Sequence, residues 1–446
     1  MKFNRNGTTR KPPGAPPTSS PAGSPISTHD PYGAMRYRDY RLLLTGSFVG
    51  GFGQQMLSIA LGWELYNRTR SALVLGGIGL AQVIPLILLT LPAGHVADRY
   101  NRRYVVIAAQ VVLALGSLGL AALSAAHGPL LLIYGCLVVI GGASSFSSPA
   151  GSAMVAQVIP AAVYENAMTW RSSIGQLSAV MGPAAGGFLI GLLHGATWVY
   201  VIDGMCALVY VSLLSLMRVR RHEGNVGSGR SLRSLVEGVR FFAQTQVMLA
   251  AITLDLFAVL LGGATTLLPV FARDILHVGP FGLGWLQAAS SVGAVCMALA
   301  LAHRPPFGKA GRTLLVAVAA FGLATIVFGL SRSFMLSFAM LFLLGAFDNV
   351  SVVIRSTLVL MRTPDEMRGR VGAVSSLFVG TSNQLGGFES GLAAQIFGPT
   401  LAVVGGGIGT VIVVLLVAWR WPEMRRLTTL AEAVPPTASR QEKGVG

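Results

Sequence analysis

The chain has 446 residues, of which 53% are hydrophobic and only 11% are charged, with 33 Lys and Arg against 17 Asp and Glu. This charged share is less than half that of a typical soluble protein, and the mean hydropathy is +0.64, so the composition excludes an ordinary soluble enzyme and indicates a polytopic membrane protein. The net charge of +16 does not indicate nucleic-acid binding, because most basic residues lie between apolar runs, where they set membrane orientation.

The two ends of the chain are polar. Residues 1–35 are rich in Pro, Ser, Gly and Thr and contain no hydrophobic stretch after their basic residues, which predicts a disordered tail rather than a signal peptide. Residues 421–446 are similarly polar and are predicted to form a second tail.

Twelve apolar runs between the tails are each long enough to cross about 30 Å of hydrocarbon as a helix. Helices are expected because backbone polar groups in lipid must be satisfied within the segment. The sequence therefore predicts an all-α membrane protein with twelve transmembrane helices. Their approximate spans are 42–66, 71–92, 104–126, 129–150, 166–193, 197–217, 247–275, 281–302, 313–330, 334–357, 370–397 and 399–419.

A polar loop at residues 218–246 divides these runs into two sets of six, so we expect two pseudo-symmetric six-helix bundles, 36–217 and 247–420. The sequence "SLRSLVEGVRFF" within this loop predicts a short amphipathic helix at the inner surface of the membrane.

The basic residues predict the topology. If both termini are inside, four of the 33 basic residues fall in outer loops (Arg68, Arg70, Arg273 and Arg332) and two fall within helices (Arg171 and Arg355), which leaves 27 inside. This imbalance predicts that both termini are cytoplasmic.

The sequence contains none of the usual motifs for catalysis or cofactor binding. The chain has no phosphate-binding loop, no cluster of His and Cys with metal-ligand spacing and no hydrolytic triad, and its three cysteines lie in apolar runs. We therefore expect neither an enzyme nor a cofactor or metal site.

A cluster of charges in "AGHVADRYNRRYV" separates the second and third runs. Its pattern resembles the signature of the major facilitator superfamily, although Asn101 stands where that family usually has Gly. Asn tolerates the left-handed conformation better than most residues. The residues that carry the resemblance are Gly94, Asp98, Arg99, Arg102 and Arg103.

The resemblance implies a latch that closes the inner side of the transporter in its outward-open state. Asp98 would meet the positive N-terminal end of the eleventh helix, where Arg368 and Arg370 are further candidate partners. The alternative is that these charges only follow the positive-inside rule, which explains the arginines but not Gly94 or Asp98.

The fifth run contains a second motif, Gly182-Pro183-x-x-Gly186-Gly187, which resembles that of drug/proton antiporters in the same superfamily. Ser178 stands where the usual motif has a further Gly. Generic packing of small residues is the alternative. The motif favours export over uptake.

Further stretches between residues 35 and 420, such as "TPDEMRGRVGAVSSLF", resemble the enterobactin-exporter-like branch of bacterial inner-membrane effluxers. The resemblance implies a proton-coupled exporter of an amphipathic small molecule such as a siderophore, macrolide or drug, working by alternating access. Its partners would be this cargo, protons and the lipid bilayer, and a monomer is the working expectation. The alternatives are an importer of the same fold, or a membrane sensor or lipid-handling scaffold.

Acidic residues within apolar runs are costly and therefore raise a functional question. Asp348 and Asp255 are the candidates for proton coupling, and the alternative for both is a structural pair with an arginine. Arg355 follows Asp348 by seven residues, or about 10 Å along a helix axis, so it is not an obvious partner of Asp348. Glu64 and Asp203 lie near outer helix ends, where a solvated acid is ordinary.

A further set of polar residues could bind cargo or gate the pathway. Glu389 is the charged candidate, and the neutral candidates are Gln54, Gln55, Gln82, Asn383 and Gln384. Each neutral side chain could instead join neighbouring helices.

Overall fold

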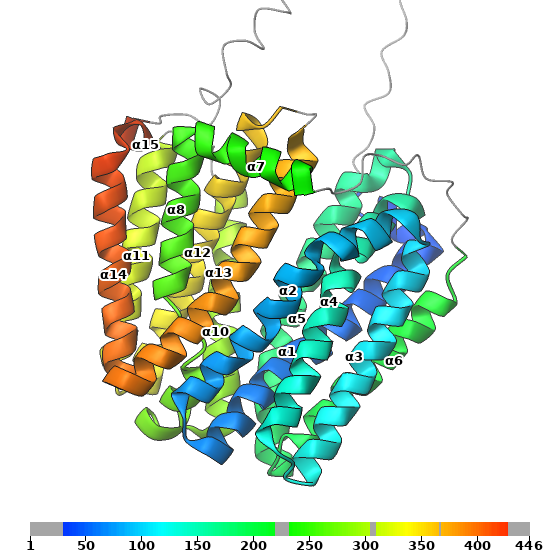
Figure 1. The fold of residues 1–446 in the computed structure, drawn as a ribbon, viewed down its shortest axis with the longest axis horizontal. Coiled ribbons are helices and arrows are strands. Elements are labelled where there is room, and N and C mark those ends of the chain that lie inside the picture. Colours follow the sequence, from blue (N-terminus) through cyan, green and yellow to red (C-terminus); the bar gives the residue numbers. More distant parts are fainter. Residues whose placement is uncertain (1–29, 219–231, 304–308, 365–366, 427–446) are drawn as a thin grey trace, which may run out of the picture.

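The computed structural model describes residues 30–218, 232–303, 309–364 and 367–426. This part of the chain is helical and contains no strand, which confirms the all-α prediction (Figure 1). The first half comprises α1 (Arg38–Thr69), α2 (Ala72–Arg99), α3 (Arg102–Ala125), α4 (Leu130–Val158), α5 (Tyr164–Leu193) and α6 (Thr197–Ser215). The second half comprises α8 (Gln246–Leu261), α9 (Leu268–Val270), the π-helical turn η3 (Phe271–Ile275), α10 (Gly279–Ala302), α11 (Ala310–Leu330), α12 (Phe334–Arg362), α13 (Arg368–Phe397), α14 (Pro399–Arg420) and α15 (Pro422–Arg426).

Nine helices in the described ranges are long and apolar enough to cross a membrane, or ten if the bent pair of α7 and α8 is one span. The helices α1 and α13 are not among them, although they have 32 and 30 residues. Both helices carry amide side chains that line an internal cavity, which lowers their hydropathy. The chain is thus a multi-pass helical membrane protein, and the count of twelve spans stays a prediction.

The helix α7 (Leu232–Gln244) confirms the amphipathic helix expected between the two halves. It meets α8 at a bend of 106° and packs across α13. A Cβ atom on Gly238 would lie 2.8 Å from a Val374 methyl group, so the glycine allows this close crossing. We call the end of the molecule at which α7 lies the α7 end (Figure 1).

The seventh span is broken, whereas the sequence predicted one continuous run over residues 247–275. The helix α8 ends at Leu261, and regular helix resumes only at Leu268. Gly262 and Gly263 are poor helix formers, and Pro269 lies in the first turn of the resumed helix, where its missing N–H removes no helical hydrogen bond. The broken segment places Thr265 and Thr266 beside the internal cavity.

The hydrophobic cores differ between the two ends of the molecule. One core contains residues of both halves, including Leu65 and Leu75 from the first and Phe271 and Leu283 from the second. Two other cores lie within single halves, around Leu254 in the second half and around Tyr40 in the first. The halves therefore share a core at the end opposite α7 and have separate cores towards the α7 end.

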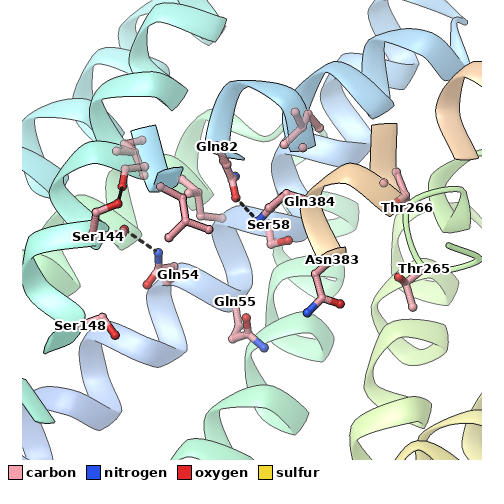
Figure 2. Close-up of a pocket in the computed structure, with 18 of the residues that line it drawn as sticks. Gln54, Gln55, Ser58, Gln82, Ser144, Ser148, Thr265, Thr266, Asn383 and Gln384 are labelled. Carbon is pink, nitrogen blue, oxygen red and sulfur yellow. Dashed lines mark hydrogen bonds between the residues drawn. The ribbon is translucent and has the colours of Figure 1, made fainter. Parts of the chain in front are cut away.

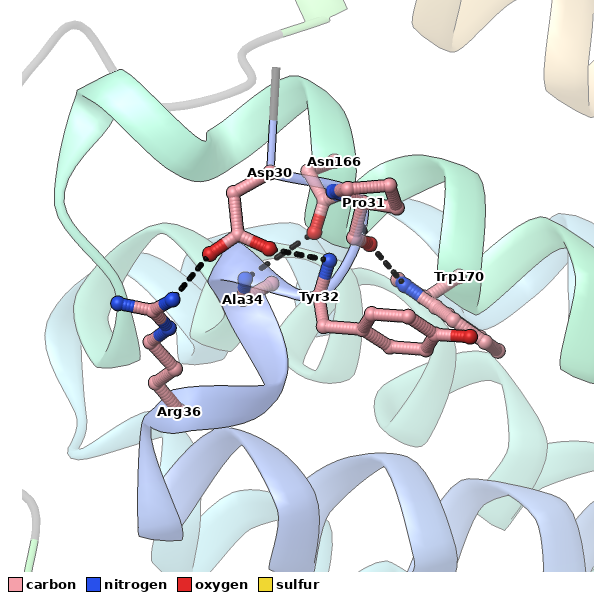
Figure 3. Close-up of polar contacts among 7 residues, drawn as sticks. All are labelled: Asp30, Pro31, Tyr32, Ala34, Arg36, Asn166 and Trp170. Atoms are coloured by element: carbon pink, nitrogen blue, oxygen red, sulfur yellow. Dashed lines mark hydrogen bonds and ion pairs between the residues drawn. The ribbon is translucent and has the colours of Figure 1, made fainter. Parts of the chain in front are cut away.

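The segment just before α1 is attached to α5, although the sequence placed residues 30–35 in a disordered tail (Figure 3). Asn166 accepts a hydrogen bond from the Ala34 amide at 3.0 Å, and the Trp170 indole donates to the Pro31 carbonyl at 3.0 Å. Asp30 forms an ion pair with Arg36 at 2.7 Å. Most of the predicted N-terminal tail, residues 1–29, and most of the C-terminal one, residues 427–446, lie outside the described residues.

Candidate functional site

A cavity of about 900 Å³ lies between the two halves (Figure 2). Its lining is mostly neutral: nine Ser and Thr side chains, a group of Leu and Ile side chains, and six amides. The amides come from both halves and are Gln54, Gln55, Gln82, Gln287, Asn383 and Gln384.

The cavity reaches the surface at the α7 end. Its lining there includes Ser152, Arg368 and Gly369, all of which are exposed. At its other end the lining residues Leu75 and Leu283 are fully buried in the core that both halves share. The molecule is therefore open on one side and sealed on the other.

All five neutral residues predicted to meet cargo line this cavity. Gln384 donates a hydrogen bond to Gln82 at 2.9 Å, which joins α13 to α2 across the two halves. Gln54 donates a long hydrogen bond of 3.5 Å to Ser144. Gln55 makes no side-chain hydrogen bond within the described part of the chain, so its amide is available to a ligand. Cargo binding by these residues stays a prediction.

The candidate acids lie outside the lining of this cavity. Asp255 forms an ion pair with Arg355, and the two side chains are only 10% and 9% exposed. The pair connects α8 to α12 beside a separate small cavity. The geometry thus matches the structural alternative for Asp255, which the sequence left open.

Asp348 lies on α12, seven residues before Arg355. The residue is exposed, and its carboxylate forms no ion pair or hydrogen bond with a described residue. Glu389 also lies outside the main cavity, and it accepts a hydrogen bond of 3.4 Å from Ser390.

Two acids that the sequence placed in solvated positions are buried. Asp203 is 7% exposed and accepts a hydrogen bond from Ser117 at 2.5 Å, which ties α6 to α3. Glu64 is 9% exposed and pairs with Arg68 one turn later in α1. Packing of neighbouring helices, which a single run does not reveal, buries both carboxylates.

The motif between α2 and α3 connects helix ends within the first half. Asn101 accepts a hydrogen bond from the Arg103 amide at 3.0 Å and so caps α3. Arg102 and Arg103 donate to the carbonyls of Ala153 in α4 and Ser215 in α6, at 3.1 and 2.6 Å. These arginines therefore fasten α3 to α4 and α6.

The predicted partners of this motif lie on the other half. Gly94 is buried and Arg99 is exposed, and the side chain of Asp98 lies outside the described part of the structure. Arg370 pairs with Glu237 of α7 at 2.5 Å, and Arg368 lines the mouth of the cavity. The latch, which the resemblance assigns to the outward-open state, stays a prediction.

The motif in α5 forms two close contacts. A Cβ atom on Gly182 would lie 2.5 Å from the Gln55 side chain, and one on Gly186 would lie 3.1 Å from the Met56 backbone, so both glycines pack on α1. A Cβ atom on Gly187 would lie 2.4 Å from the Pro280 carbonyl of α10 in the other half. Pro183 lies within the helix and is buried. The motif therefore packs α5 on both halves.

A contact that joins the two halves at the sealed end was not predicted from the sequence. Arg70, after α1, forms an ion pair of 2.9 Å with Asp274 of η3, and the Tyr66 hydroxyl donates to the same carboxylate. The Arg273 guanidinium lies 5.9 Å from the centre of the Trp63 ring. Both arginines were assigned to outer loops by charge alone, and their proximity to these partners depends on the packing of the two halves.

Known proteins provide an independent comparison. Residues 29–440 match the family described as transmembrane secretion effector, which lies within the major facilitator superfamily. The chain belongs to the major facilitator superfamily. Facilitator-family relatives include the multidrug efflux pump Tap of Mycolicibacterium fortuitum, 26% identical over 80% of this chain and 89% of the relative. The enterobactin exporter EntS of Citrobacter koseri is 25% identical over 87% of this chain and 92% of its own length.

Solved structures of facilitator-family proteins share the fold. A bacterial homologue of the human lysosomal transporter Spinster, in an inward-facing and occupied conformation, superposes with a TM-score of 0.70 at 17% identity, over 90% of this chain and 99% of that one. The nucleoside transporter NupG gives a TM-score of 0.69 at 13% identity, over 86% and 99%. These matches confirm the predicted family and fold, and the chain is a transporter-type protein rather than an enzyme.

Proposed function

We propose that this chain is a proton-coupled exporter of an amphipathic small molecule, located in a bacterial inner membrane with both termini in the cytoplasm. The observation that carries the proposal is the cavity between the halves, which is open at the α7 end and sealed at the other. The excess of basic residues makes the α7 end the cytoplasmic one, so this state would receive cargo from the cytoplasm. Relatives named as efflux pumps and exporters favour the outward direction of transport.

Proton coupling is assigned first to Asp348. Its carboxylate has no partner within the described residues, so it can take up and release a proton without breaking an ion pair. Asp255 would first have to leave Arg355, which makes it the second candidate. The proposed proton sites lie apart from the amides of the cavity, so protons and cargo would bind at different places. The two binding events would then be coupled through the change between the inward-open and outward-open states.

The function is tested with the full-length chain in proteoliposomes under an imposed pH gradient. We expect the gradient to drive flux of an uncharged probe such as chloramphenicol, and a protonophore to abolish it. Asp348→Asn should leave flux that no longer responds to the gradient, whereas Asp30→Asn, at the surface, should behave like the unmodified protein. Flux in the unmodified protein that does not depend on the pH gradient contradicts proton coupling. Flux in Asp348→Asn that still depends on the gradient contradicts Asp348 as the proton site.

A further inference from the structure

The cavity lining lacks the groups that recognise cations. Among the described lining residues there is no Asp, Glu, Phe, Tyr or Trp, and the one charged side chain, Arg368, is itself a cation at the mouth. A cation that leaves water requires a counter-charge or an aromatic face to offset its lost hydration. This cavity offers neither at its lining.

The acids elsewhere in the second half do not supply the missing charge. Asp255 is neutralised by Arg355 and is almost completely buried. Asp348 and Glu389 do not line the cavity. The aromatic residues that directly follow lining residues in the sequence, Trp63, Phe378 and Phe388, are likewise not part of the lining.

The lining is instead rich in neutral hydrogen-bonding groups. An amide side chain can donate and accept, and a hydroxyl can do both. Figure 2 shows Gln55 of α1 and Asn383 of α13 with their amides in the space between the halves. Gln55, Ser58 and Gln287 make no side-chain hydrogen bond to another described residue, so they are available to a ligand. The aliphatic side chains between these groups suit a carbon skeleton.

We infer that the cargo is an uncharged molecule that carries several hydroxyl or amide groups, and that lipophilic cations are rejected. The inference rests on the proposed transport function and narrows it to a substrate class. The volume of about 900 Å³ is near the top of the usual range for pockets that hold drug-sized ligands, roughly 300–1,000 Å³. A cargo of this kind can contact amides of both halves at once.

The test compares probes of different charge on the full-length protein. Uncharged iron-free enterobactin and chloramphenicol are compared with the permanent cations tetraphenylphosphonium and ethidium. Binding is measured as a ligand-induced rise in melting temperature in detergent, and transport as flux in proteoliposomes. We expect the uncharged probes to bind and to be transported at least about tenfold faster than the cations.

A single substitution should reverse this preference. Gln55→Glu keeps the shape of the side chain and introduces the missing counter-charge, so it should allow ethidium to bind and be transported. Gln244→Glu, at an exposed position of α7 outside the cavity, introduces the same charge and should leave the selectivity unchanged. A single symmetric peak in size-exclusion chromatography and an unchanged melting temperature without ligand report that both variants are folded.

The outcomes separate the two proposals. Equal transport of cations and uncharged probes by the unmodified protein overturns the inference and leaves the transport function standing. A folded Gln55→Glu protein that still excludes ethidium also overturns it, because the missing carboxylate would then not explain the selectivity. If no probe binds or moves, the proposed function fails together with the inference.

Discussion

At the residue scale, the most consequential contact is the buried ion pair of Asp255 and Arg355. Two charges that are about 10% exposed have lost most of their hydration, and each depends on the other to offset that loss. Asp348, on the same helix as Arg355, is exposed and has no such partner among the described residues. Two acids that look alike in the sequence therefore have different surroundings in the structure.

Removing one member of the pair should destabilise the protein strongly. We expect Asp255→Asn to cost about 3–5 kcal/mol because it leaves the Arg355 charge buried and uncompensated. Combining it with Arg355→Met should recover much of that loss, as measured by the melting temperature of the detergent-solubilised chain. Asp348→Asn is the matched control and should change stability by no more than about 0.5 kcal/mol. Additive losses in the double variant would show that the two residues do not act as a pair.

At the element scale, the halves meet where glycines allow helix backbones to approach. Gly187 of α5 and Gly284 of α10 face each other, and a Cβ atom on Gly284 would lie 2.6 Å from the Pro183 carbonyl. Gly76 of α2 and Gly391 of α13 form the equivalent contact, because a Cβ atom on Gly391 would lie 2.7 Å from the Gly76 backbone. Small residues at such crossings are a general device of membrane helices.

A methyl group at the first of these crossings should impair transport. Gly187→Ala places its Cβ against the Pro280 backbone, which cannot move aside as a flexible side chain could, so we expect a large loss of flux. Gly191→Ala, one turn later, is the control because its Cβ would lie 3.8 Å from Pro280, an ordinary contact. Alanine favours helix over glycine by about 1 kcal/mol at both positions, so a weakened helix does not explain a loss. Equal flux in the two variants would contradict a role for the close crossing.

At the scale of the whole molecule, the shared core and the contact of Arg70 with Asp274 hold one end closed while the cavity opens at the other. Exposed ion pairs contribute only about 0–1 kcal/mol, so the shared apolar core supplies most of the closure. The polar contact can nevertheless bias an equilibrium between two states that differ by a few kcal/mol. It is the counterpart, at the sealed end, of the latch predicted around Asp98.

Weakening this contact should favour the conformation that opens at the sealed end. Thr265→Cys provides a reporter in the cavity, in a background where Cys136, Cys206 and Cys296 are replaced by alanine. We expect Asp274→Asn to raise the rate at which a membrane-impermeant maleimide labels this cysteine from the sealed side, by about two- to fivefold. Asp30→Asn is the control, because Asp30 is equally exposed (37%) but pairs with Arg36 within its own half. An unchanged labelling rate in Asp274→Asn would show that the ion pair does not help to keep this end closed.

Local chemistry made much of this protein predictable. Apolar runs, the amphipathic loop helix and the motif around Gly94 are properties of neighbouring residues, and they led correctly to the family and the helical membrane fold. Five of the six amides that line the cavity were also candidates for cargo binding, which stays a prediction. Backbone polar groups in lipid must form their hydrogen bonds within the segment, so an apolar run of this length has little choice but to form a helix.

Contacts between helices that are far apart in the sequence cannot be predicted from local chemistry. Asp255 and Arg355 are one hundred residues apart, so the sequence offers a pair with an arginine as an alternative for Asp255 but does not indicate which arginine. Asp274 meets Arg70, and Gly187 meets Pro280, only because the two halves pack together at one end. Hydropathy determines which segments enter the membrane, but the rotation and tilt of each helix depend on side chains of other helices, and these determine which charges pair and which amides face the cavity.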